Sequence, residues 1–156
     1  MDLKINDNTS FNAKLSIRRF PHYQKARLTQ AQALFEEMTK DKPGMMRIIP
    51  GFLDEDPNVC DLYIFSLGKG GYPSRTASRI QSAHASENWF QDLLTNKSPK
   101  EQAEAFVKIF DALNLIPAKI SKRLWINESY MSSLRKSVQE SLGNDEQLSE
   151  MFNHIV

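Results

Sequence analysis

Residues 62–67 read Leu-Tyr-Ile-Phe-Ser-Leu, a nearly continuous apolar run with the length of one β-strand. A run of this kind predicts a strand in the middle of a sheet, with Phe65 in the core. The run also divides the chain in two. Before it, apolar residues recur mainly at the period of a strand, and after it they recur at the period of a helix. Strands at one end and helices at the other predict an α+β fold rather than a β-α-β alternation.

Three more strands and one helix are predicted before this run. Alternation with polar residues is clearest at Phe11, Ala13, Leu15 and Ile17, as in a strand with one buried face. Shorter strands are predicted at 2–6 and 45–49, with hairpin loops at 6–10 and 50–58. Thr29 and Gln32 have the spacing of a capping box, so a helix is expected there, ending at Pro43-Gly44. The resulting order, ββαββ, predicts a small, mainly antiparallel four-stranded sheet.

Three or four helices are predicted in the C-terminal half. The first covers about 75–95, and the second begins at Ser98-Pro99 with Glu101 completing a capping box and Phe106 in the core. A long helix is expected over 118–142, with Asn127 on its apolar stripe. The other members of that stripe are Ile120, Leu124, Met131, Leu134, Val138 and Leu142. Gly143 is expected to end this helix, and Asn144 or Asp145 to cap a short last one.

Composition narrows the class of protein. The chain has 156 residues, a net charge of +1 and 40% hydrophobic residues, which fits one soluble domain over 1–156. One cysteine excludes an internal disulfide framework and a cysteine-based zinc site. The longest apolar run is far too short to span a membrane. We therefore expect a cytoplasmic protein with no membrane association, and neither a metal site nor a cofactor is predicted.

A glycine-rich loop follows the 62–67 run and precedes a predicted helix. Such a loop exposes backbone N–H groups to an anion, and basic side chains lie close by in sequence. The candidate anion site comprises Gly68, Lys69, Gly70, Gly71, Arg75 and Arg79. The spacing matches neither a Walker A loop nor a dinucleotide loop. The alternative is a flexible turn closed by Tyr72-Pro73.

The same glycine-rich string is similar to the acyl-CoA pyrophosphate loop of the GCN5-related N-acetyltransferases. That resemblance covers four residues and implies a small CoA-dependent enzyme. The chain departs from the family pattern at Phe65, where the family has Arg or Gln, and in having helices where the family has further strands. No other catalytic string occurs in the sequence, so we expect that the protein is not an enzyme.

A basic segment with interleaved rings spans residues 18–27. The residues that could serve a nucleic acid or another polyanion are Arg18, Arg19, Tyr23, Lys25 and Arg27. Bases of this kind contact phosphates, and rings stack on nucleobases. The alternative is a connection between strand and helix whose rings lie under the sheet.

The long helix carries more large side chains than one buried face needs. Trp125 lies off the apolar stripe, Tyr130 lies near its edge, and Arg123 is close by. These are residue types that anchor protein interfaces, although a neighbouring helix of the same chain could cover them instead. The expected function is a non-enzymatic protein–protein interaction or regulatory module. An anion or nucleic-acid binder is the alternative, and a small enzyme is the third.

Overall fold

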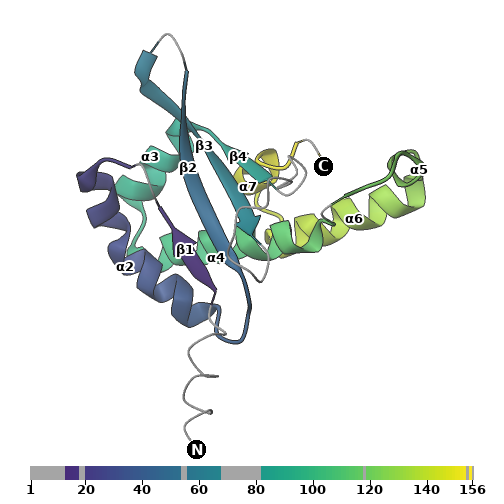
Figure 1. Ribbon diagram of the computed structural model, residues 1–156, viewed down its shortest axis with the longest axis horizontal. Helices are drawn as coiled ribbons and strands as arrows, with labels where there is room; N and C mark the ends of the chain where they lie inside the picture. Colours follow the sequence, from purple (N-terminus) through teal and green to yellow (C-terminus); the bar gives the residue numbers. More distant parts are fainter. Residues whose placement is uncertain are drawn as a thin grey trace, which may run out of the picture.

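The computed structural model of the chain describes residues 13–17, 20–53, 56–67, 82–117, 119–153 and 155, with the side chains of 51–53, 56–61 and 67 outside the description. In chain order the elements are β1 (Lys14–Ser16), α2 (His22–Met38), β2 (Met45–Leu53), β3 (Asp56–Leu67), β4 (Ser82–Ala85), α3 (Glu87–Asn96), α4 (Pro99–Leu115), α5 (Lys122–Trp125), α6 (Glu128–Ser141) and α7 (Glu146–Glu150). The α+β class and the helical C-terminal half are confirmed (Figure 1). The described residues form six helices, five of them after β4, rather than the three or four expected there.

The four strands form one sheet in the order β1-β2-β3-β4. β2 and β3 pair antiparallel, as do β3 and β4, but β1 and β2 are parallel. The sheet is therefore mixed, not mainly antiparallel as expected. The physical reason is α2, which carries the chain back along the sheet so that β2 enters in the direction of β1. The strand and hairpin loop predicted at 2–10 lie outside the described residues.

The fourth strand is β4, which the sequence interpretation assigned to a helix over 75–95. Ala83 and Ala85 are buried while His84 is exposed, an alternation typical of a strand with one covered face. Small alanines carry little strand propensity, which is why the pattern was missed. The helix begins only at Glu87, where the Ser86 side chain accepts a hydrogen bond from the Trp89 N–H and caps α3.

β2 and β3 form a longer hairpin than predicted. The strands extend to Leu53 and from Asp56, so Pro50 and Gly51, expected in a loop, lie within β2. Pro50 pairs with Leu62 of β3 on one side, and the described part of β1 reaches only as far as Arg47 on the other. A proline fits there because its missing N–H is not needed by a neighbouring strand.

The helix predicted from Thr29 begins seven residues earlier, at His22. The capping-box interpretation is wrong, because Thr29 lies inside α2 and donates to the Lys25 carbonyl. Gln32 donates to the Leu15 carbonyl of β1 instead of capping. The helix also ends at Met38, before Pro43-Gly44.

The single helix predicted over 118–142 is two helices with a break at Ile126-Asn127. Asn127 has extended backbone angles, and its side chain accepts from the Tyr130 N–H at 3.0 Å. A side chain that bonds the backbone in this way caps a helix rather than continuing one. Asn127 is therefore the N-cap of α6, not a member of a buried stripe. The capping box at Ser98 and Glu101, by contrast, is confirmed, as is the cap at Asp145.

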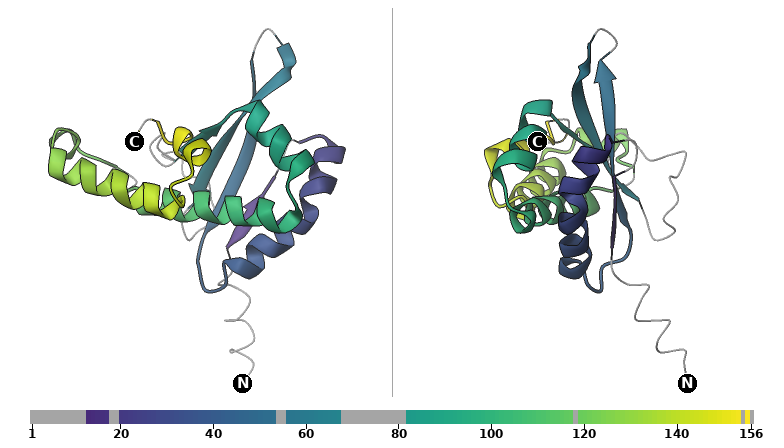
Figure 2. Two further views of the ribbon diagram at one scale, coloured as in Figure 1. Left: turned by 180° about the vertical axis from the view of Figure 1, so that it is seen from behind. Right: turned by 90° about the vertical axis from the view of Figure 1, so that its left-hand side faces the viewer.

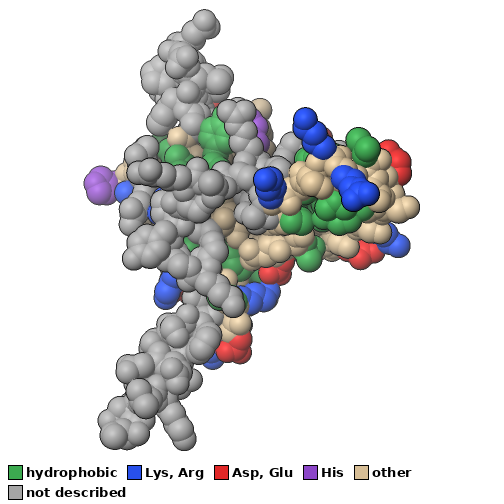
Figure 3. All heavy atoms as spheres, turned by 45° about the vertical axis from the view of Figure 1, so that its right-hand side comes forward, with side chains coloured by type: hydrophobic (Ala, Val, Ile, Leu, Met, Phe, Trp, Pro, Cys, Tyr) green, Lys and Arg blue, Asp and Glu red, His purple; other side chains and the backbone are tan. Residues whose placement is uncertain are grey.

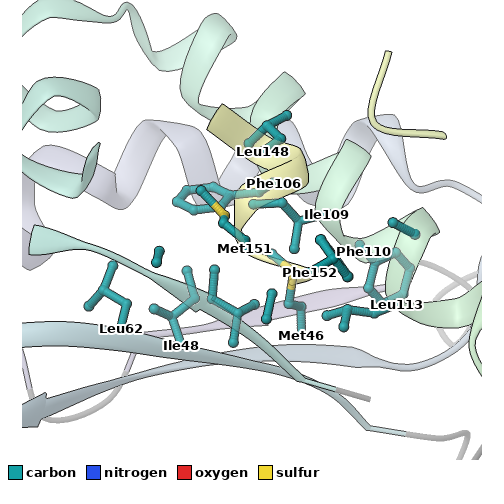
Figure 4. Close-up of a cluster of buried hydrophobic side chains, with 14 of the residues drawn as sticks. Met46, Ile48, Leu62, Phe106, Ile109, Phe110, Leu113, Leu148, Met151 and Phe152 are labelled. Carbon is teal, nitrogen blue, oxygen red and sulfur yellow. The ribbon is translucent and has the colours of Figure 1, made fainter. Parts of the chain in front are cut away.

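The core lies between one face of the sheet and the helices. α2, α3 and α4 all lie on that side (Figure 2). Met46, Ile48 and Leu62 point from the sheet towards Phe106 of α4 and Phe152 of the C-terminal turn (Figure 4). All five side chains are fully buried, so this face is dry. The expected burial of Leu15 and Phe106 is confirmed, but Phe65 is only half-buried and lies on the opposite face.

Candidate functional site

Residues 119–141, which we call the arm, extend away from the sheet (Figure 1). One side of the arm is anchored on α4 through buried side chains, among them Met131, Leu134 and Val138. At its far end the break between α5 and α6 turns the chain. Ile126 exposes 82% of its surface at this turn, and its neighbour Trp125 exposes 38%.

Three exposed bases, namely Lys119, Lys122 and Arg123, precede these two apolar side chains within a few residues of the chain. No acid occurs between residues 119 and 127. Among the described residues, ion pairs join other bases to acids, and none involves these three. Basic and hydrophobic side chains accordingly gather over the arm (Figure 3). We call Trp125, Ile126 and the three bases the arm tip.

The arm tip contains two of the three residues predicted as a partner surface. Trp125 and Arg123 are exposed, whereas Tyr130 is half-buried and packs against the core. Ile126 was not among the predicted surface residues, because the single helix expected over 118–142 has no turn at that position. The available signal was Asn127-Glu128, which resembles a capped helix start.

The second candidate surface is the face of the sheet that the described helices leave uncovered, which we call the open face. Two cross-strand rows lie side by side on it. In one row Arg47 is opposite Phe65, and in the other Ile49 is opposite Tyr63, with His84 beyond it on β4. Tyr63 is 43% exposed, and its ring centroid lies 4.9 Å from that of His84.

Arg47 is the open face's unpaired cation. Its Nε is buried and lacks a hydrogen-bond partner, and it forms no ion pair with a described residue. A buried donor without an acceptor costs about 1–3 kcal/mol. Lys14, at the edge of the same face, differs, because its Nζ lies 3.6 Å from Glu36 of α2. The sequence interpretation missed the open face because residues 62–67 were predicted as a central strand with Phe65 in the core.

The other predicted sites lie wholly or partly outside the described residues. All six residues of the candidate anion site, within 68–79, lie outside the described residues, and so do Arg18 and Arg19. The remaining three members of the basic segment lie in the first two turns of α2. Tyr23 is 62% exposed, Arg27 is exposed and Lys25 is half-buried. The anion, nucleic-acid and CoA hypotheses for these segments stay predictions.

A surface pocket of about 360 Å³ lies beside β4, between α3 and α7. Its lining includes His84, Trp89, Asp92 and Glu150. Within the described residues, no three His, Cys, Asp or Glu side chains are placed to hold a metal ion. The part of the chain that is described also lacks a helix with the length and apolar character needed to cross a bilayer.

Comparisons with known protein families, with curated proteins and with solved structures gave no match.

Proposed function

We propose that the protein is a non-enzymatic interaction module that binds another protein through the arm tip. The observation that carries the proposal is the pair of neighbouring apolar side chains at the turn after α5, Ile126 at 82% exposed and Trp125 at 38%. Scattered exposed apolar residues need no explanation, but two large ones together at the end of a projecting element form a compact anchor. Tryptophan and arginine are enriched among the residues that dominate interface energies.

The charges of the arm tip indicate the chemistry of the partner. Lys119, Lys122 and Arg123 have no acidic partner in the described part of the chain, so acidic groups on another protein are free to pair with them. We propose a partner with a small apolar pocket rimmed by Asp and Glu. Charges at an interface rim speed association, and their attraction is screened as the salt concentration rises.

The arm holds this surface in a fixed shape before binding. Asn127 caps α6 at the turn, and Met131 and Leu134 anchor the helix on α4. A surface that is already ordered loses less conformational entropy on binding. We also propose a cytoplasmic location. The chain has a single cysteine, whereas small proteins of oxidising compartments are often built on disulfide frameworks.

Affinity capture from cells that naturally produce the protein tests the proposal. Wild type, Ile126→Ser and Leu115→Ser would be compared as baits. Leu115 is a matched control, because it is also an exposed aliphatic side chain, at 46%, but lies at the end of α4. We expect a protein that is retained by wild type and Leu115→Ser and lost with Ile126→Ser. Equal retention by all three baits, or by none, would contradict the proposal.

A further inference from the structure

We infer that the open face binds single-stranded nucleic acid, at a site separate from the arm tip. The site consists of Arg47 on β2, Tyr63 and Phe65 on β3, and His84 on β4. The inference goes beyond protein binding by the arm and does not depend on it.

The rings on the open face have the spacing that stacking requires. Tyr63 and Phe65 are two residues apart on a central strand, so they point to the same side about 7 Å from each other. His84 lies beside Tyr63 and widens the ring surface, with the two planes inclined by 35°. Successive bases of an extended single strand stack on rings arranged in this way, and a four-stranded sheet with aromatic side chains is a general solution for it.

Arg47 supplies the complementary charge. It lies directly opposite Phe65, with its Nε buried and without an acceptor in the protein. A phosphate oxygen, or an oxygen on the edge of a base, would pair with the guanidinium of this half-buried side chain. Stacking faces next to an unsatisfied cation match a ligand that combines flat aromatic rings with anionic groups.

The same features argue against a duplex as the ligand. A duplex presents its phosphates but keeps its base faces stacked inside, out of reach of Tyr63 and Phe65. A single strand uses both the rings and the cation.

Fluorescence anisotropy with labelled oligonucleotides of about 12 residues, at about 50 mM salt, tests the inference. The probes are oligo-uridine, oligo-thymidine and a duplex of the same length. We expect the full-length protein to bind at least one of the single strands more tightly than the duplex. Tyr63→Leu should weaken binding roughly 5- to 150-fold, the range for loss of one stacked base, and Tyr63→Phe should retain it.

Leu115→Ala is the control, because Leu115 is also a large exposed apolar side chain, at 46%, but lies at the end of α4, on the helical side of the sheet. It should leave the affinity unchanged. Arg47→Gln should reduce the slope of log affinity against log salt by about 0.7, the value for one phosphate contact on a single strand. Ile126→Ser, at the arm tip, should bind as wild type does.

Several outcomes would overturn the inference. They are the absence of single-strand binding by wild type, equal affinity for the duplex, and equal losses in Tyr63→Leu and Leu115→Ala. If Tyr63→Leu lowered the melting temperature strongly, Tyr63→Phe together with Arg47→Gln would decide, because unchanged binding in Arg47→Gln contradicts the assigned site.

Discussion

Tyr63 and His84 face each other across β3 and β4, with ring centroids 4.9 Å apart. The next residues along the same strands, Ile64 and Ala83, pair on the opposite side of the sheet and are buried. One pair of strands therefore presents aromatic rings on one face and a dry aliphatic surface on the other. This difference between the faces leads to the first prediction.

Phe106→Ala and Phe65→Ala should differ in their cost to stability. Phe106 is fully buried between α4 and the sheet, so its truncation should lower the free energy of unfolding by about 3–5 kcal/mol. Phe65 is half-buried on the open face. Its truncation should cost about 1–2 kcal/mol, because folding buries less of its apolar surface than of Phe106. Urea denaturation of both variants measures the difference. Equal costs would mean that the open face is covered.

The sequence predicted well those elements whose signals are local. The start of α4 follows from Ser98-Pro99 and Glu101, because a capping box is satisfied within four residues. The buried face of α6, at Met131, Leu134 and Val138, was also predicted, because helix periodicity repeats over several turns.

The failures involve choices that depend on distant parts of the chain. The parallel pairing of β1 with β2 depends on where α2 packs, and β4 becomes a strand because β3 offers it an edge. Whether Phe65 is in the core depends on which face the helices cover, and a single strand's pattern does not contain that information. Trp125 and Arg123 are exposed, as a partner surface requires, but the turn at Asn127 was not predicted.

Ser98→Ala should lower the free energy of unfolding by about 1 kcal/mol. The Ser98 side chain accepts from the Glu101 N–H, and removing it leaves a helix-end donor without its partner. Ser137→Ala, at an exposed position inside α6, is the control and should be neutral or slightly stabilising. Thermal and urea denaturation of the two variants provide the comparison. An equal effect of both substitutions would argue against the cap.

Glu101 makes stability depend on pH. Hydrogen bonds from the Ser98 backbone and side chain, with a smaller contribution from Lys97, hold the pKa of its carboxyl below the ordinary value of 4.5. Because the folded pKa is lowered, the stabilisation is present above pH 4.5 and is lost as pH falls through the folded value. Glu101→Gln keeps a capping side chain but does not titrate. The advantage of wild type over this variant in melting temperature should therefore shrink below pH 4.5, and a constant difference across that range would contradict the assignment.

Trp125 should report an exposed position in the free protein. In a Trp89→Phe variant it is the one remaining tryptophan, since the chain has two. Its emission should be red-shifted and readily quenched by acrylamide, because the side chain is 38% exposed at the end of the arm. A blue-shifted, protected emission from the monomer would show that the protein's own core covers Trp125.

Site-specific photocrosslinking from the arm tip tests the proposed protein-binding function most directly. A benzophenone amino acid would replace Ile126 in cells that naturally produce the protein, and in a control it would replace Lys40, which is exposed in the turn after α2. We predict a discrete crosslinked protein from position 126, absent from position 40 and lost when Trp125→Ala is added. No product from position 126, or the same products from both positions, would contradict the account.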